Sequence, residues 1–230
     1  MKFKQKENEM NQTDKVIDMQ NEFGETRLMK SVLSGCIAGV KIALAQGASL
    51  NIQDKMGHTA LALACIYNHP EIEKLLIQAG ADVNISYISY TTPLIHACYN
   101  GNTAQIKRLI KAGADVNASD CDDMSPLTYA VKSNVLSAVE AVLEAQPNVN
   151  IQDMHKRTPL IWASTPDRID MFEVLLKAGA STEICDKNGK TVLDYAIKMQ
   201  NPKAVKLIQQ YQPKMRKMVN QYLNHEKQNG

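Results

Sequence analysis

The chain of 230 residues repeats one short pattern at a constant spacing of 33 residues. Each copy begins with Thr or Ser and carries Leu two positions later. The first residues of the six copies are Thr26, Thr59, Thr92, Ser125, Thr158 and Thr191. Self-similarity at a fixed period indicates stacked supersecondary units, each of which contacts only its neighbours along the chain. The sequence therefore predicts a stack of similar units that share a continuous core.

Each unit carries the signals of two helices. Thr or Ser is expected to cap the first helix, because its hydroxyl can accept a bond from an orphan backbone N–H. Pro follows the cap at Pro93, Pro126 and Pro159, where its missing N–H would be unpaired in any case. The Leu of the pattern and an Ala three residues later fall on one helical face, and the small Ala lets neighbouring helices approach closely. The second helix is marked by the pairs Leu75-Leu76, Leu109-Ile110, Val142-Leu143 and Leu175-Leu176.

A further marker follows each second helix on the same period. Glycine is expected to end that helix in the left-handed conformation that other residues resist. The residues at this position are Gly47, Gly80, Gly113, Gln146 and Gly179. An Asn series follows at the same spacing, at Asn51, Asn84, Asn117 and Asn150. We expect these Asn side chains, and the Asp residues near them, to bond locally to the backbone of their own turn.

A 33-residue period with a Thr-Pro-Leu-x-x-Ala core resembles the ankyrin repeat, over about residues 18 to 210. The resemblance implies an all-α solenoid of helix–turn–helix units whose tips are β-turns or hairpins. Aromatic residues make up only 5% of the chain, so the core is expected to consist of Leu, Ile, Val, Ala and Met. The usual ankyrin His would stand at Ile95, one residue before His96. Its bond to a neighbouring turn is therefore not carried over to this chain.

The chain is predicted to have three parts. Residues 1–17 form a polar segment that is expected to be disordered, residues 18–210 the repeat domain, and residues 211–230 a basic amphipathic C-terminal helix or tail. That last segment has three open interpretations: it closes the final repeat, it binds a partner or a membrane surface, or it is disordered. The repeats are bounded at 22–54, 55–87, 88–120, 121–153, 154–186 and 187–210.

No set of residues in the sequence predicts catalysis. We find no motif that joins a nucleophile to a base, no phosphate-binding glycine loop, and no metal-ligand spacing among the five Cys and five His. Cys65 and Cys98 occupy the same position in adjacent repeats, which favours a buried packing role. We therefore expect a protein that is not an enzyme and that has no catalytic residues, no cofactor and no metal site.

The resemblance implies that the chain binds another protein, because ankyrin domains generally use their turn tips and the exposed side of their first helices. The tips vary while the scaffold positions hold, and neighbouring tips change from acidic Asp122-Asp123 to basic Lys156-Arg157. This change of sign favours an oriented, dipolar partner. We predict contact across the central groove of repeats two to five, through Tyr87, Tyr90, Tyr99, Asp122, Asp123, Lys156, Arg157 and Trp162.

The turn tips of three repeats depart from the family pattern. Glycine occupies one turn position at Gly57 and Gly189. The middle repeats carry larger residues there, namely Tyr90, Asp123 and Lys156. Because only glycine adopts left-handed backbone without strain, the pattern leaves the geometry of these three turns open.

A column of mostly aromatic side chains runs along the first helices at the same spacing. Its members are Leu63, His96, Tyr129, Trp162 and Tyr195. Two interpretations remain open for this column. It arises either from stacking between repeats or from a partly exposed platform, which Tyr99 and Lys132 would flank at the helix ends.

Other functions are weighed beside protein binding. The repeats could serve self-assembly of a structural solenoid, and the basic C-terminal helix could contact nucleic acid or a membrane surface. The expected partner is a protein whose identity the sequence does not give, rather than a small-molecule substrate, a nucleic acid or a membrane, and the chain is predicted to be a monomer. The polar N-terminal segment and the absence of closely spaced cysteines predict a cytoplasmic location. This could be the cytoplasm of the cell that makes the chain or of a cell into which the chain is delivered.

Overall fold

A computed structural model describes residues 16–212 of the chain, and these divide into two compact units. The first unit consists of residues 16–97 with Arg108–Asp115, and the second of Cys98–Lys107 with residues 116–212. Two helices, α6 (Pro93–Tyr99) and α7 (Thr103–Lys111), supply residues to both units.

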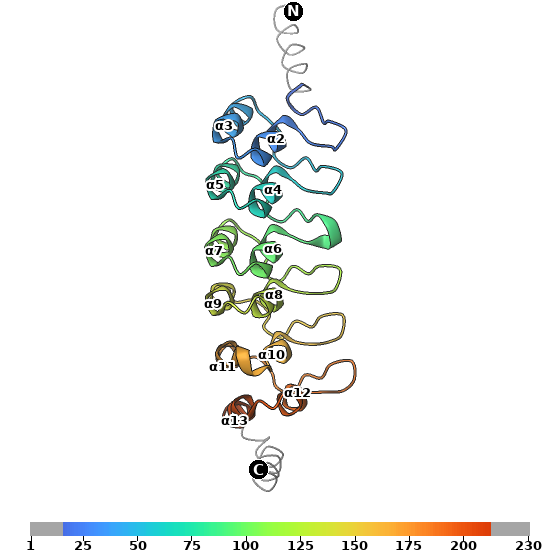
Figure 1. The fold of residues 1–230 in the computed structure, drawn as a ribbon, viewed down its shortest axis with the longest axis vertical. Helices are drawn as coiled ribbons and strands as arrows, with labels where there is room; N and C mark the ends of the chain where they lie inside the picture. The colour runs from blue at the N-terminus through green and yellow to red at the C-terminus, as the bar shows by residue number, and fades with distance from the viewer. Residues whose placement is uncertain (1–15, 213–230) are drawn as a thin grey trace, which may run out of the picture. The chain divides into compact units, whose positions relative to one another are not determined.

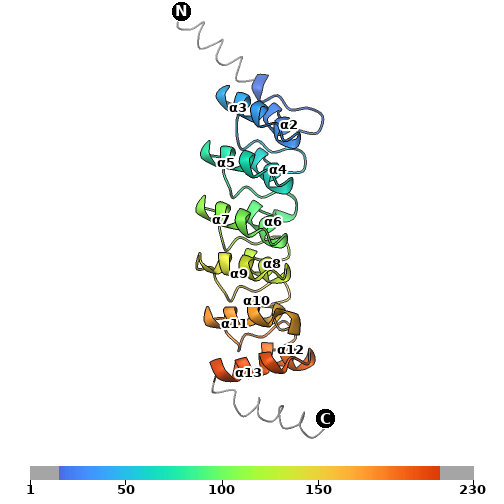
Figure 2. The ribbon, with the colours of Figure 1, turned by 60° about the vertical axis from the view of Figure 1, so that its left-hand side comes forward.

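The first unit is built from helix pairs. Its helices are α2 (Arg27–Leu33), α3 (Ile37–Ala45), α4 (Ala60–Ile66) and α5 (Pro70–Gln78), followed by the short 3₁₀ helix η1 (Ile88–Tyr90). Helix α2 packs against α3 within its own repeat and against α4 of the next repeat, and α5 packs likewise against α4 and α3 (Figures 1 and 2). The first helices therefore contact one another, as do the second helices.

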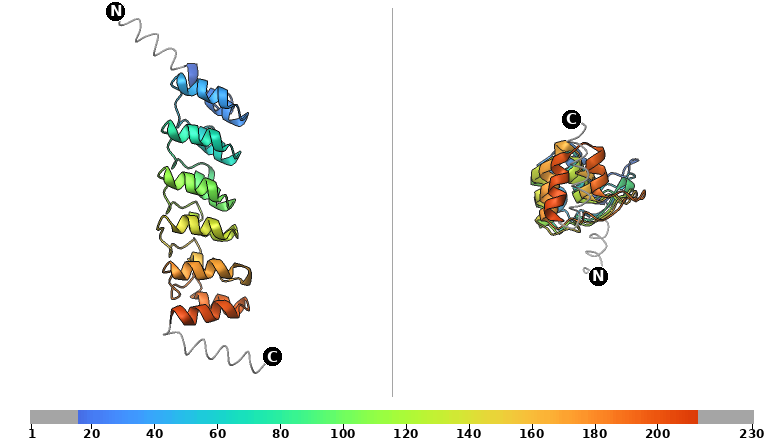
Figure 3. Two further views of the ribbon diagram at one scale, coloured as in Figure 1. Left: turned by 90° about the vertical axis from the view of Figure 1, so that its left-hand side faces the viewer. Right: turned by 90° about the horizontal axis from the view of Figure 1, so that it is seen from below.

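The second unit repeats this arrangement. Its elements are α8 (Pro126–Lys132), α9 (Leu136–Leu143), α10 (Pro159–Trp162), the 3₁₀ helix η2 (Pro166–Arg168), α11 (Ile169–Lys177), α12 (Val192–Lys198) and α13 (Pro202–Tyr211). Helix α10 packs against α8 and α12, while α11 packs against α9 and α13, which Figure 3 shows as yellow, orange and red helices lying side by side. The predicted all-α fold of helix–turn–helix repeats is confirmed for the described residues, whose one isolated bridge pairs Tyr87 with Thr91.

Two of the predicted segments fall largely outside these residues. The polar N-terminal segment is described only at residues 16 and 17, and the C-terminal helix only at residues 211 and 212. Their structures, and the boundaries assigned to the repeat domain, stay predictions.

The capping residues act as predicted. Thr59 Oγ1 accepts a bond from Ala62 N at 3.1 Å, and Ser125 Oγ accepts one from Thr128 N at 3.2 Å. The alanine of the pattern is completely buried in five repeats, at Ala64, Ala97, Ala130, Ala163 and Ala196. A first helix with so small a residue on its contact face lets its neighbour approach closely, which is why this face is continuous within each unit.

The second helices end in left-handed backbone, also as predicted. Gly80 has φ +92°, and a Cβ atom there would meet nothing within 4 Å. The backbone conformation, rather than a lack of space, therefore favours glycine. Gln146 adopts the same region with φ 54°, so the repeat that lacks glycine keeps the geometry at the cost of some strain.

The prediction for the Asn series was wrong. Asn51 Oδ1 accepts a bond from Asp82 N at 3.0 Å, and Asn150 Oδ1 accepts one from Ser181 N at 2.8 Å. Both partners lie 31 residues further along the chain, in the next repeat, so these amides link repeats instead of closing their own turn. The local bond is instead made two residues before the Asn, where Asp82 Oδ1 accepts a bond from Asn84 N at 2.8 Å.

A buried ion pair interrupts the apolar core of the first unit, and the sequence analysis missed it. Glu73 is completely buried, and its carboxylate accepts bonds from Arg108 Nε at 3.1 Å and Nη2 at 2.9 Å. The other residues at the position of Glu73 are Val40, Ile106, Val139, Phe172 and Val205, all completely buried. One acid in an otherwise apolar column was the signal that could have revealed the pair.

We expect Leu127→Ala to lower the free energy of unfolding by about 2–5 kcal/mol, because Leu127 is 0% exposed on α8 and its truncation leaves a cavity. Chemical denaturation measures the change. As a control, Ile42→Ala removes a side chain that is 51% exposed and should change stability by about 0.5 kcal/mol or less. A loss of that small size for Leu127→Ala would contradict the burial of this position.

Removing one member of the buried pair should cost more than removing both. Arg108→Met leaves the Glu73 charge without this partner and is expected to destabilise the fold by about 3–5 kcal/mol. Glu73→Val combined with Arg108→Leu should recover most of that loss, because both charges leave together. Lys74→Met, which breaks the exposed pair with Glu71, serves as the control at about 1 kcal/mol or less. A double variant as unstable as Arg108→Met would show that loss of the Arg108 charge beside Glu73 is not the cause.

Candidate functional site

The turn tips are organised by one acidic position. Asp120 Oδ1 accepts bonds from the backbone N–H groups of Asp122 and Met124, both at 2.9 Å. Asp153 Oδ1 does the same for His155 and Arg157, also at 2.9 Å. The residues at this position are Asn21, Asp54, Tyr87, Asp120, Asp153 and Asp186. Five of the six can therefore hold their turn through a short polar side chain.

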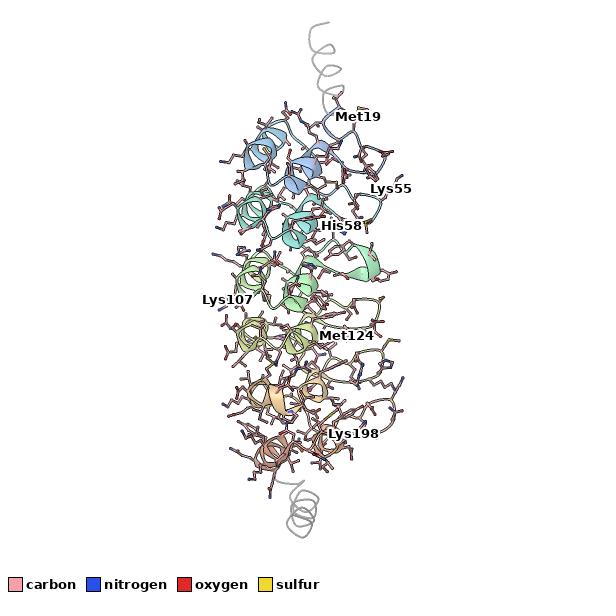
Figure 4. The ribbon with its side chains drawn as sticks, viewed as in Figure 1. Met19, Lys55, His58, Lys107, Met124 and Lys198 are labelled. Atoms are coloured by element: carbon pink, nitrogen blue, oxygen red, sulfur yellow. The ribbon has the colours of Figure 1, made fainter. Side chains whose placement is uncertain are left out.

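Tyr87 is the exception, and its turn has a different shape. The segment forms the 3₁₀ helix η1, in which Ser89 and Tyr90 both have φ 60°. The Tyr87 ring packs 4.9 Å from the ring of His58, and its hydroxyl is buried without a hydrogen-bond partner among the described residues. Burial raises the pKa of Tyr87. Figure 4 shows Lys55 at the outer end of the preceding turn and His58 nearer to α4.

At the glycine position itself, the three departing turns keep left-handed backbone. Gly57 and Gly189 have φ of 81° and 72°, and the larger residues adopt the same left-handed region. Their φ values are 60° at Tyr90, 56° at Asp123 and 59° at Lys156. Left-handed backbone strains a residue other than Gly, Asn or Asp, so the turns of Tyr90 and Lys156 depend on the rest of the repeat to hold them.

In the second unit the aromatic column is tied to the turns. The second oxygen of each turn aspartate accepts a bond from the aromatic side chain nine residues later. The pairs are Asp120 with Tyr129 Oη at 2.6 Å, Asp153 with Trp162 Nε1 at 3.1 Å, and Asp186 with Tyr195 Oη at 2.7 Å. All three aromatic residues are partly exposed. The column is therefore both a packing feature and a platform that solvent can reach.

Two cations lie against the rings of this column. The Arg157 guanidinium is 4.1 Å from the ring centroid of Trp162, and Lys132 Nζ is 4.7 Å from the same ring and 5.3 Å from that of Tyr129. Tyr99 meets Tyr129 edge to face, with centroids 5.9 Å apart. We call these five residues, all in the second unit, the ring–cation cluster. Cation–π and edge-to-face contacts of this kind each contribute on the order of 1 kcal/mol.

A short first helix helps to position the cluster. Residues before proline avoid helical backbone, and Thr165, which precedes Pro166, has ψ 149°, so α10 ends at Trp162. The Arg168 guanidinium then donates to the carbonyl of Trp162 at 3.1 Å and to that of Lys132 at 3.4 Å. Because Trp162 and Lys132 are the last residues of their helices, this one side chain supplies partners for two helix-end carbonyls.

The predicted contact residues fall into two groups. Tyr87 and Tyr90 lie on one turn of the first unit, where Tyr90 is 69% exposed. The other six lie in the second unit, and the structure brings Arg157 and Trp162 into contact. Tyr99 is 62% exposed beside Tyr129, and the turn residues Asp122, Asp123 and Lys156 are exposed.

Some residues of the site were missed by the sequence analysis. Asp120 and Asp153 anchor the rings, and Arg168 holds the helix ends. An Asp that recurs every 33 residues, nine positions before an aromatic residue, was the available signal for the first two. Nothing in the repeat pattern pointed to Arg168, whose role depends on the early end of α10.

The described residues show no group of three or more His, Cys, Asp or Glu that could hold a metal ion. Cys65 and Cys98 are buried, and burial raises the pKa of both thiols. None of the helices between residues 16 and 212 combines the length and the apolar character that a membrane span requires.

Comparison with known proteins identifies the repeat. A family model described as ankyrin repeats (3 copies) matches residues 4–87, 88–153 and 148–218, which is most of the chain. A search of curated proteins by sequence finds no match.

We predict that Tyr195→Phe raises the pKa of Asp186. Burial alone would raise that pKa, but hydrogen bonds from Lys190 N, the Tyr195 hydroxyl and Asn188 lower it to about 2. The unfolded value is about 4, so the carboxylate stabilises the fold above pH of about 4, and this contribution is lost as the pH falls toward 2.

Carboxyl-carbon NMR titration measures the Asp186 pKa directly, with Tyr67→Phe as the control because that ring is 54% exposed and far along the chain. An Asp186 pKa that is the same in the wild type and in Tyr195→Phe would show that the hydroxyl does not hold this carboxylate.

Proposed function

The chain belongs to the ankyrin-repeat family, and from that premise we propose that it is a protein-binding module whose second unit meets its partner through the ring–cation cluster and the adjoining turns. Ankyrin repeats are generally protein-interaction modules. The proposal covers roles as scaffold, adaptor, inhibitor or effector, because these differ in the partner rather than in the binding face.

The observation that carries the proposal is a set of large side chains that are held in place and yet reach solvent. Tyr99 is 62% exposed, and Trp162 and Tyr129 are partly exposed although their polar atoms bond to buried aspartates. Tyr, Trp and Arg are the residues most enriched in the energetic centres of protein interfaces. Side chains that are already ordered lose little conformational entropy on binding, which favours affinity.

The charges on the turns beside the cluster favour one orientation of a bound partner. Asp122 and Asp123 carry negative charge on one turn, and Lys156 carries positive charge on the next. The two turns are joined, because Met154 N donates to Asp122 O at 2.9 Å. A partner with the opposite order of charges would be favoured over the reversed orientation. The exposed Tyr90 turn of the first unit is proposed as a further partner-binding surface.

Affinity capture from a lysate tests the proposal with two matched variants of the full chain. Tyr99→Ala with Lys156→Glu changes two exposed residues of the proposed face and should weaken binding by about 30-fold or more, as loss of an interface hot spot does. Glu140→Ala with Lys206→Glu changes two exposed residues of the second helices α9 and α13 and should leave capture unchanged. Equal melting temperatures establish that all variants are folded.

A partner that both variants retain equally, or that only the second-helix variant loses, would contradict the proposed face.

A further inference from the structure

Within the described part of the chain, the Lys132 ammonium group lies against two aromatic rings and pairs with no carboxylate. It lies 4.7 Å from the Trp162 ring centroid and 5.3 Å from that of Tyr129. Among residues 16–212 it takes part in no ion pair, whereas the other cation of the cluster, Arg157, is paired with Asp153 at 2.9 Å. The two cations of the cluster therefore differ, since one is neutralised within the fold and the other is not.

The two carboxylates that bond to the rings of Tyr129 and Trp162 are largely buried. Asp120 and Asp153 are 9% and 4% exposed, and both accept bonds from backbone N–H groups and from a ring of the column. Lys132 is only partly buried, and the guanidinium of Arg168 lies against its carbonyl. Of the charged groups in contact with the rings, only cations are therefore accessible to a partner.

The aromatic rings restrict the Lys132 side chain, which favours binding of an anion. A free lysine side chain is flexible, and holding it against aromatic faces removes part of the rotamer entropy that binding would otherwise cost. Partial burial also strengthens the attraction between opposite charges relative to a fully exposed pair. A carboxylate would thus meet an ammonium group that is already positioned and incompletely neutralised.

A single carboxylate fits the surroundings better than a polyanion. Asp122 and Asp123 on one turn and Asp167 in η2 are exposed in the same unit and would repel a chain of phosphates. Nucleic acids are bound through many Lys and Arg side chains together, and here Lys132 stands as one accessible cation among aromatic rings. Tyr99, 62% exposed beside Tyr129, offers an apolar surface for the residue next to the carboxylate.

We propose that Lys132 is the anion-binding position of this module, and that it receives an Asp or Glu side chain of a peptide segment whose neighbouring apolar residue packs against Tyr99. The inference rests on the proposed function, to which it adds the chemical class of the partner: an acidic, partly apolar segment of a protein.

The chain contains one tryptophan, Trp162, so its fluorescence reports from the site itself. Peptides are selected from a random twelve-residue display library against the full chain, then synthesised and titrated. The selected sequences should be enriched in Asp and Glu beside apolar residues. Replacing the acid of a selected peptide by its amide should weaken binding by about tenfold or more, as loss of a charged hydrogen-bond partner does.

Lys132→Gln should cause a loss of the same size, and the two changes together should cost no more than either alone. Lys198→Gln is the matched control, because Lys198 occupies the position of Lys132 two repeats later, at the end of α12 (Figure 4). It should leave the affinity within about twofold of the wild type, as a distant exposed charge does.

Three results would overturn the carboxylate site. Selected peptides without acids, or acidic peptides that bind Lys132→Gln as tightly as the wild type, would do so while leaving the protein-binding function intact. A single-stranded twelve-residue oligothymidylate that quenches Trp162, depends on Lys132 and weakens steeply with salt would assign the position to phosphate instead. A library that yields no binder, together with a captured partner that Tyr99→Ala does not affect, would count against the proposed function as well.

Discussion

A helix pair of this size cannot bury its own apolar face, and within each unit the next pair covers it. The contact is close because a completely buried alanine stands in the middle of the first helix, as at Ala130 and Ala163. Asn side chains reinforce it by accepting backbone bonds from the following repeat, as Asn150 does from Ser181. Since the period has no insertion, equivalent residues of successive repeats fall in line. The positions of Tyr129, Trp162 and Tyr195 in one column follow from this stacking.

The carboxylates of the turns hold the aromatic side chains of the first-helix column in fixed positions. Asp153 holds two backbone N–H groups of its turn, the indole N–H of Trp162 and the guanidinium of Arg157. One buried side chain thereby fixes the turn, the ring and a cation relative to one another. One repeat of the first unit lacks this carboxylate, because Tyr87 stands at its position, and the turn there becomes a 3₁₀ helix with two residues at φ 60°. Lys132, which no carboxylate holds, remains available to a partner.

The repeat pattern predicted what depends on local chemistry. The caps, the buried alanines and the left-handed ends of the second helices each follow from the residue at that position, so one sequence sufficed. Interactions between repeats were harder to predict. The Asn bonds were assigned to their own turn because the sequence of one turn does not show which atoms of the next repeat lie beside it. The pair of Glu73 and Arg108 was missed because the two residues stand at different positions of their repeats. The column was recognised, but the choice between packing and platform required the ring contacts with Asp120 and Lys132.

The proposed function depends on contact between a partner and the first-helix face of the second unit. Site-specific photocrosslinking tests it directly, with a photoreactive phenylalanine derivative in place of Tyr99 or, for comparison, in place of Glu140, an exposed residue of α9. The account predicts a crosslinked partner protein from position 99 and none from position 140. A crosslink from position 140 alone, or equal yields from both positions, would contradict it.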